Sequence, residues 1–175
     1  DLLFFTDRGK VYQIKMYDVP EGTRATKGKS IMNFLSLADN EKVTSVLAVP
    51  RGKKDNEASL LMVTRAGVAK RVTVKDMSDV RRSGIIAIKL KSGDELLSVA
   101  VVLPGEEAII ATSAGQAIRF KVNSIREMGR AAGGVRAIRL KRDDVIVGLG
   151  AIAADQKQNQ FLVVSENGFG KKTAL

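Results

Sequence analysis

The sequence contains neither cysteine nor histidine, and aromatic residues make up only 5% of it. The missing thiols and imidazoles exclude disulfide bonds, the commonest metal ligands, and nucleophilic or acid-base mechanisms built on those side chains. The scarcity of aromatic residues argues against stacking on unpaired bases, which single-strand binders use. No apolar run approaches the length of a membrane span, and the start at Asp1 shows no signal-peptide pattern. We expect an internal fragment of a soluble, untargeted protein.

Positive charge dominates what the sequence does contain. Among its 175 residues, 29 Lys and Arg oppose 19 Asp and Glu, which gives a formal net charge of +10. The excess is spread along the chain, and 45% of the residues are apolar, which is enough for one domain with a core. We favour a folded surface that binds a polyanion, and a basic protein that is merely soluble is the alternative.

One sequence pattern occurs four times. An apolar run is followed by a small polar residue, a glycine turn and a basic strand, with a period of about 50 residues. The four copies are LLFFTDRGKVYQIKM, LLMVTRAGVAKRVTV, AIIATSAGQAIRFKV and FLVVSENGFGKKTAL. Their turn glycines are Gly9, Gly67, Gly115 and Gly168. A period of this length is typical of propeller blades.

The second half of each unit repeats as well. An apolar strand, an acidic turn and another apolar strand recur in IMNFLSLADNEKVTSVLAV, IIAIKLKSGDELLSVAVV and VRAIRLKRDDVIVGLGAI. Each unit thus holds four short strands, rich in Val, Ile, Leu and Phe and bounded by Gly, Asp and Asn. We predict an all-β, propeller-like array of four-stranded blades. It forms one partial ring, with blades at about 1–50, 51–103 and 104–154 and a partial blade at 155–175.

Basic residues recur at two positions of the unit. In the strand after the turn glycine they are Lys10, Lys15, Lys70, Arg71, Lys75, Arg119, Lys121, Lys171 and Lys172. In the loop before the third strand they are Arg24, Lys27, Lys29, Arg81, Arg82, Arg126, Arg130 and Arg136. Gly28, Gly84, Gly133 and Gly134 lie among the second set. Stacked blades would align these cations into one continuous track.

Glycine beside Arg or Lys suits a phosphate backbone. A loop without side-chain bulk lets backbone N–H groups approach a phosphate while long cationic side chains straddle it. We therefore predict binding of duplex DNA with little sequence preference, because phosphate contacts carry no sequence information. The predicted contacts are Lys10, Lys15, Lys27, Lys29, Lys70, Arg71, Arg81, Arg82, Arg119, Lys121, Arg130, Arg136, Lys171 and Lys172.

Three phrases of the sequence resemble successive blades of the C-terminal domain of bacterial DNA gyrase A. They are FFTDRGKVYQIKMYDVPEGTRATKGKSI, RRSGIIAIKLKSGDELL and MGRAAGGVRAIRL, and the resemblance covers essentially the whole chain. It implies a β-pinwheel, a disc whose blades exchange strands, that wraps duplex DNA around its edge. It also implies a place in a cytoplasmic, nucleoid-associated bacterial complex of gyrase A with gyrase B, where gyrase B hydrolyses ATP for negative supercoiling.

The resemblance also limits what this fragment does by itself. No catalytic residue, metal or cofactor is expected in it, since the family's DNA-cleaving tyrosine lies in another domain. The hallmark Gln-Arg-Arg-Gly-Gly-Lys-Gly box of the first blade does not occur in the sequence, and we expect the fragment to start after it. Arg81 to Gly84 and Gly129 to Gly134 look like degenerate copies. The related domain of topoisomerase IV, a protein-interaction propeller and an independent enzyme are the alternatives.

Other chemically suggestive groups receive structural interpretations. Tyr12 and Tyr17 lie in and just after a basic strand without supporting histidines or clustered acids, so we expect them to pack. The paired carboxylates share one repeat position, which indicates turns instead of Mg²⁺ ligands or acid-base partners. These carboxylates are Asp39 and Glu41, Asp94 and Glu95, and Asp143 and Asp144. The segment GFGKKT at 168–173 departs from the phosphate-loop pattern at two positions, which disfavours nucleotide binding.

Overall fold

Short strands make up most of the fold. A computed structural model describes residues 1–49, 57–77, 80–81, 83–153 and 160–174. The helical elements in this part of the chain are 3-10 turns, namely η1 (Met16–Asp18), η2 (Ile31–Asn33), η4 (Val74–Met77) and η5 (Val122–Ser124). The strands are β1 (Leu2–Thr6), β2 (Lys10–Ile14), β3 (Val43–Ala48), β4 (Ser59–Thr64), β5 (Val68–Thr73), β6 (Ile85–Ile86), β7 (Leu96–Val102), β8 (Glu107–Thr112), β9 (Ala117–Lys121), β10 (Val135–Arg136), β11 (Ile146–Ile152), β12 (Gln160–Val164) and β13 (Gly170–Ala174). The prediction of an all-β, propeller-like fold is confirmed.

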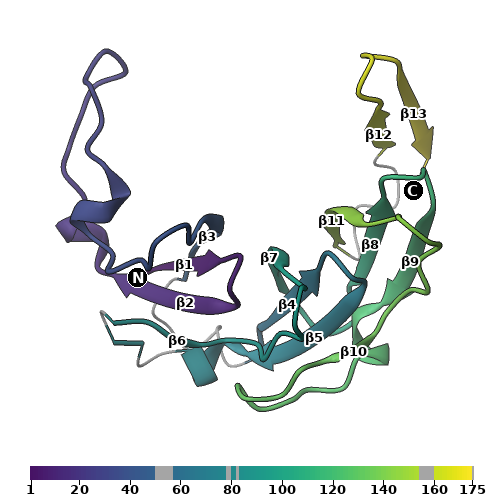
Figure 1. Ribbon diagram of the computed structural model, residues 1–175, viewed down its shortest axis with the longest axis horizontal. Helices are drawn as coiled ribbons and strands as arrows, with labels where there is room; N and C mark the ends of the chain where they lie inside the picture. The colour runs from purple at the N-terminus through teal and green to yellow at the C-terminus, as the bar shows by residue number, and fades with distance from the viewer. Residues whose placement is uncertain (50–56, 78–79, 82, 154–159, 175) are drawn as a thin grey trace.

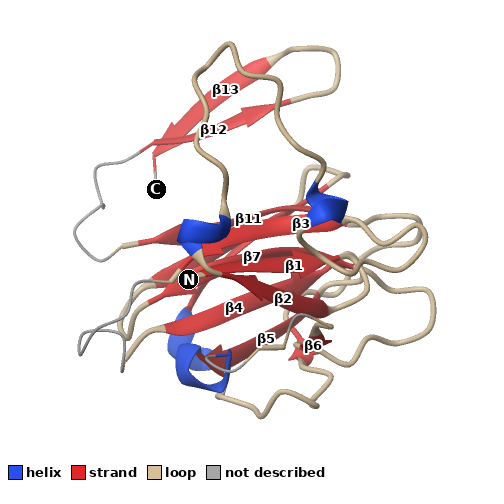
Figure 2. Cartoon of the chain, turned by 90° about the vertical axis from the view of Figure 1, so that its left-hand side faces the viewer, coloured by secondary structure: helices blue, strands red, loops and turns tan. Residues whose placement is uncertain are grey.

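The strands form antiparallel sheets that follow one another along an open arc (Figure 1). The first sheet has the order β3-β1-β2-β6, the second β10-β5-β4-β7 and the third β11-β8-β9, and β12 and β13 form a hairpin. The loop between η1 and η2 projects away from the sheets in both views (Figures 1 and 2). The predicted turn glycines Gly9, Gly67, Gly115 and Gly168 all adopt positive φ between the first two strands of each unit.

Neighbouring repeats exchange strands. Strand β6 belongs to the second repeat but pairs with β2 of the first, and β10 of the third repeat pairs with β5 of the second. The second and third repeats therefore contain four strands each, and the short third strand of each completes the preceding sheet, whereas the described residues of the first repeat form three strands. This interleaving ties successive sheets together through the backbone, as the pinwheel interpretation implied.

Both faces of the second sheet are buried. Along β4, Leu60 and Met62 pack in the core between the first and second sheets, while Leu61 and Val63 pack in the core between the second and third. Because successive side chains of a strand point to opposite faces, a strand between two cores must be apolar throughout. This explains why its sequence SLLMVT shows no alternation of apolar and polar residues.

Gly134 allows a short exchanged strand to lie close to the preceding sheet. Its φ is +84°, and a Cβ atom there would lie 2.7 Å from the carbonyl oxygen of Ala69. We expect Gly134→Ala to destabilise the fold by at least about 2 kcal/mol, because it adds left-handed strain to a clash with backbone. Gly93→Ala is the matched control, since Gly93 has a φ of +79° but open space at the Cβ position. Urea denaturation checks this, and equal losses in the two variants would mean that the close approach costs nothing.

Candidate nucleic-acid interface

Exposed cations gather at the outer edges of the first and second sheets. We call the outer rim the set Arg81, Lys89, Lys91, Arg130, Arg136, Arg139 and Lys141, which lie on β10 or in the segments flanking β6 and β10. Strands β6 and β10 lie on the convex side of the arc, and β3, β7 and β11 lie on its concave side (Figure 1). These inner strands contain no ionisable side chain. The cations of the outer rim thus lie on the convex side of the arc, and the strands on its concave side carry no charge. We call this the radial arrangement of charge.

An alternating pattern after β6 presents two of these cations to solvent. Ile88 and Leu90 pack over Gly9, where a Cβ atom would come within 2.6 Å of the Ile88 carbonyl oxygen and 3.1 Å of Leu90 Cγ. The residues between and after them, Lys89 and Lys91, are exposed. The glycine turn of one repeat thus packs against Ile88 and Leu90 of the next, and the two lysines face solvent.

The third repeat copies this arrangement. Ile138 and Leu140 pack over Gly67, while Arg139 and Lys141 are exposed. These four cations were not among the predicted contacts, although AIKLK at 87–91 and AIRLK at 137–141 place them at matching positions. The alternation of apolar and basic residues in these two segments is the pattern that could have identified them.

The glycines of the basic loops pack against protein. A Cβ atom at Gly84 would lie 2.6 Å from the ring of Tyr12, just as one at Gly134 would meet Ala69. Only glycine, which has no Cβ atom, fits where a loop crosses the preceding sheet so closely. Gly28, in contrast, has open space around it. The interpretation of these glycines as phosphate-approach points therefore gives way, at Gly84 and Gly134, to a packing role.

Two cations from successive repeats are brought together at the rim. The backbone N–H of Lys89 donates to the carbonyl of Ala132 at 3.2 Å. The loop that carries Arg130 therefore lies directly beside the segment that carries Lys89. Both side chains are exposed, so one surface region combines cations of the second and third repeats.

Lys70 does not lie on the surface, which corrects its prediction as a DNA contact. Its side chain is fully buried. Its ammonium donates to the carbonyls of Ala87 at 2.6 Å and Arg130 at 2.5 Å. Burial lowers the pKa of the Lys70 ammonium to about 8, against the opposing charge of Asp76. Lys70 and Val72 lie on the same face of β5, which packs towards the first sheet, so the Lys70 ammonium cannot reach a phosphate outside.

Arg71 is also occupied within the protein. Its side chain is only 13% exposed, and its guanidinium donates to the side-chain oxygen of Asn123 at 3.1 Å. It lies 3.8 Å from the Glu127 carboxylate, which accepts a hydrogen bond from Ser59 at 3.0 Å. These contacts fasten the third repeat to the second sheet, so Arg71 is poorly placed for DNA.

Three other predicted contacts have acidic partners. Lys15 lies 2.8 Å from Asp1, and Lys10 lies 4.0 Å from Glu41. The guanidinium of Arg119 pairs across the strands with Glu107, through a 2.8 Å hydrogen bond from Nε. Partly exposed pairs of this kind contribute little to stability and can exchange partners. We keep these three cations as predicted DNA contacts, although an acidic partner already balances part of their charge.

The remaining predicted contacts are exposed, but the structure does not bring all of them together. Lys27 and Lys29 lie in the projecting loop, Lys121 ends β9, and Lys171 and Lys172 lie on β13. Arg24, Lys75 and Arg126 are exposed as well. Arg82 lies outside the described residues. Arg81, Arg130 and Arg136 are the predicted contacts that belong to the outer rim.

The acidic repeat position serves turns, as the sequence indicated. Asp94 accepts the backbone N–H of Ala66 at 3.0 Å, and Asp144 accepts that of Ala114 at 2.9 Å. Both carboxylates thereby hold the β-turn of their own repeat. Burial would raise the pKa of Asp144, but the hydrogen bonds that it accepts lower the pKa below its ordinary value.

The two tyrosines have different environments. Tyr12 is buried, as expected, and its hydroxyl lies 3.1 Å from Glu41 Oε2. Burial, with the adjacent Glu41 charge, raises the pKa of Tyr12 to about 12. Tyr17 is 82% exposed, so its predicted packing is wrong. It follows β2 in η1, where the chain leaves the sheet for the projecting loop.

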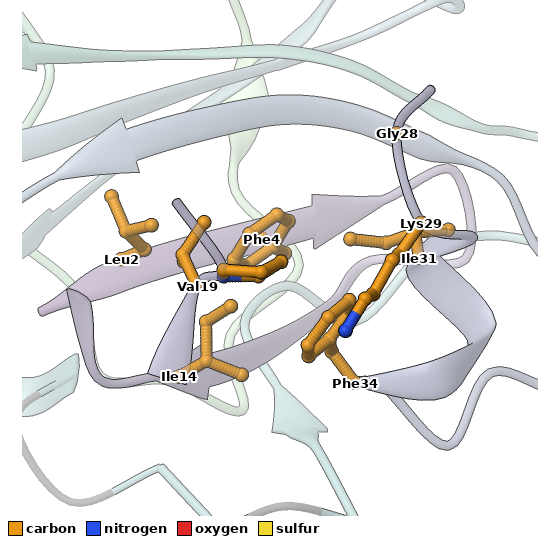
Figure 3. A pocket seen from close by; sticks show the side chains of 9 residues that line it. Leu2, Phe4, Ile14, Val19, Gly28, Lys29, Ile31 and Phe34 are labelled. Carbon is orange, nitrogen blue, oxygen red and sulfur yellow. The ribbon is translucent and has the colours of Figure 1, made fainter. Parts of the chain in front are cut away.

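An apolar pocket lies on the face of the first sheet that points away from the second. Leu2, Phe4, Ile14 and Phe34 line it together with residues of the projecting loop, and its volume is about 320 Å³ (Figure 3). Lys29 is its one ionisable lining residue. This lining offers no convergent set of polar groups for catalysis.

In the described part of the chain, no helix is long and apolar enough to cross a membrane.

One family matches the chain repeatedly. The family described as "DNA gyrase C-terminal domain, beta-propeller" matches residues 1–50, 58–103, 106–153 and 159–175. Each of these matches contains one turn glycine of the fourfold repeat. The repeat found in the sequence and the repeat of the family are therefore the same unit.

Curated relatives extend along the whole chain. The DNA gyrase A protein of Staphylococcus epidermidis is 38% identical over 174 residues, and that of Haloquadratum walsbyi is 40% identical over 176 residues. The alignments cover 99% of this chain but 19% and 20% of the two relatives. The chain thus spans about a fifth of the length of these relatives.

Solved structures share the fold. The C-terminal domain of DNA topoisomerase IV has a TM-score of 0.88 at 26% identity, and the match covers 99% of this chain and 53% of that one. The DNA gyrase A C-terminal domain has a TM-score of 0.80 at 27% identity, with coverages of 99% and 54%. The arc of sheets is similar to roughly half of each of these domains.

Proposed function

The chain belongs to the DNA gyrase C-terminal domain family, and from this membership we propose that it binds duplex DNA along the outer rim and bends it around the convex side of the arc. The radial arrangement of charge carries the proposal. Exposed cations recur at matching positions of successive repeats, whereas the inner strands are uncharged. A duplex that follows the convex side meets these cations in succession.

The expected contacts are to phosphates. Duplex DNA carries one negative charge per roughly 1.7 Å of its axis, so cations spaced along a curved edge neutralise phosphates on a bent path. The described residues hold no helix that could enter the major groove, since their helical elements are single 3-10 turns. Binding by this surface has little dependence on base sequence.

Within the whole protein, this domain acts as part of gyrase A. The wrapped duplex is presented to the enzyme that gyrase A and gyrase B form, in the bacterial cytoplasm at the nucleoid. Negative supercoiling and ATP hydrolysis belong to that complex, and the domain contributes neither a catalytic residue nor a cofactor. Identities of 38–40% to gyrase A relatives over the whole chain support gyrase.

Topoisomerase IV is the second candidate. The solved C-terminal domain of DNA topoisomerase IV has the higher TM-score of the two solved structures described, 0.88 against 0.80. Both candidates share the binding of a duplex at the outer rim.

Binding of a duplex of arbitrary sequence at increasing salt tests the proposal. We expect log K to fall linearly with log salt, with a slope of about −0.9 for each phosphate neutralised. Energy transfer between dyes on the two duplex ends should rise on binding, because bending shortens their separation. A salt-independent affinity, or tight binding to one sequence alone, would refute phosphate binding, and a protein-interaction propeller would then be the better interpretation.

A further inference from the structure

A buried ammonium joins three segments of the chain at the junction of the first and second sheets. Lys70 extends from β5, and its Nζ lies 2.6 Å from the Ala87 carbonyl and 2.5 Å from the Arg130 carbonyl. Ala87 follows the exchanged strand β6, and Arg130 lies in the loop Gly129–Gly134 of the next repeat. A single side chain thus links the second sheet to the two segments that carry rim cations.

The strand itself does not require a lysine at this position. The matching residues of the first and third repeats, three positions after their turn glycines, are Tyr12 and Ile118. Burying an ammonium is costly, and an apolar side chain of similar volume is often as stable or more so. The lysine at this position is therefore better explained by the two carbonyls that it binds than by the packing of β5.

The loop that Lys70 holds presents its cation outward. The carbonyl of Arg130 points to the buried ammonium, while the Arg130 side chain is exposed. On its flank, the Lys89 N–H donates to Ala132 at 3.2 Å, and a Cβ atom at Gly133 would lie 3.1 Å from the Lys89 carbonyl oxygen. Lys70 holds the loop from within, and the Lys89 backbone holds it from the side.

We propose that Lys70 is a positioning residue for DNA binding: it holds the Gly129–Gly134 loop so that Arg130 and Lys89, from successive repeats, engage one stretch of phosphate backbone together. This inference rests on the proposed binding of DNA at the outer rim. Lys70 itself touches no DNA. Its loss acts through Arg130.

Lys70→Met tests the inference, because it keeps the length of the side chain and removes its N–H donors. In the DNA-free protein, we expect amide hydrogen exchange of residues 130–133 to speed up at least tenfold. Duplex affinity should fall roughly eightfold at 0.1 M salt, and the salt slope should shrink by about 0.9, the value for one lost phosphate contact. Arg130→Ala should give the same fall, and the double variant should bind no more weakly than either single variant.

Arg71→Met is the matched control on the same strand. It removes the contacts to Asn123 and Glu127 but leaves both hydrogen bonds of Lys70 in place. A general loosening between repeats would therefore affect both variants, whereas loop positioning affects only Lys70→Met. We expect Arg71→Met to leave the salt slope unchanged.

The possible failures are distinguishable. A wild-type protein that does not bind the duplex overturns the proposed function and this inference with it. If the wild type binds and Arg130→Ala weakens binding, then full affinity of Lys70→Met, or additive losses in the double variant, overturns the inference alone. Should Lys70→Met not fold, NMR of the unsubstituted protein decides, since the Lys70 ammonium and Arg130 carbonyl signals must shift when duplex is added. Unchanged signals overturn the inference.

Discussion

Replacing both Lys89 and Arg139 with alanine is expected to lower the affinity for duplex DNA roughly sixty-fold at 0.1 M salt, if each contacts one phosphate. The two residues occupy matching positions of the second and third repeats, and both are exposed on the outer rim. Two lost contacts shrink the log–log salt slope by about 1.8, so the deficit should nearly vanish close to 1 M salt. Fluorescence anisotropy with a labelled duplex across a salt series measures both quantities.

The matched control removes two cations near the inner strands. Lys42 immediately precedes β3, and the backbone of Arg65 hydrogen-bonds to Glu95 and Ile146, where β7 and β11 begin. Both side chains are exposed, and Lys42→Ala with Arg65→Ala removes two positive charges, as the rim variant does. The Arg65 guanidinium also pairs with Glu95 at 3.1 Å. We expect only a small loss of affinity from it, and thermal stability of either double variant within about 0.5 kcal/mol of the wild type. Equal losses of affinity would mean that net charge alone binds DNA.

The repeat made the architecture predictable from the sequence, whereas the exchange of strands was implied only by the family resemblance. The four predicted glycine turns with apolar runs around them each lie between the first two strands of a unit in the structure. Strands β6 and β10 are two residues long, too short for an alternation of apolar and polar residues to show. Which sheet they complete depends on the close contacts of Gly84 and Gly134 with the preceding repeat, and no local pattern encodes that.

The sequence showed which segments are basic more easily than it showed which of their side chains reach the surface. Arg130 and Arg136 do lie at the rim, because basic loops beside short strands end at a sheet edge. Lys70 and Arg71 sit in a strand with a neighbour on both faces, so their long side chains reach protein before solvent. A lysine flanked by apolar residues on a buried strand is indistinguishable, in sequence, from one that reaches past the edge.

Glu41→Ala is expected to destabilise the fold by about 3 kcal/mol or more near neutral pH, because it leaves buried hydrogen-bond donors without an acceptor. The buried carboxylate accepts hydrogen bonds from the Thr6 hydroxyl at 2.6 Å, the Ala38 N–H at 3.0 Å and the Tyr12 hydroxyl at 3.1 Å. Among the hydrogen bonds of the described residues, these three donors have no acceptor other than Glu41. Urea denaturation followed by circular dichroism measures the loss.

The pH dependence separates the charge of Glu41 from its packing. Burial alone would raise the pKa of Glu41, but hydrogen bonds from Thr6, Ala38 and Tyr12, with the nearby Lys10 charge, hold the pKa below its ordinary 4.5. A carboxyl whose folded-state pKa is lowered contributes stability above its unfolded pKa and loses it as pH falls through the folded value. Glu41→Gln should therefore be less stable than the wild type near neutral pH, and the difference should narrow as the pH falls below the ordinary pKa of a glutamate and through the lowered pKa of Glu41. Asp39→Asn, which removes an exposed carboxylate from the same turn, is the control that should show little of this narrowing. A gap between Glu41→Gln and wild type that stayed constant with pH would mean that Glu41 stabilises the first sheet by shape and not by its charge.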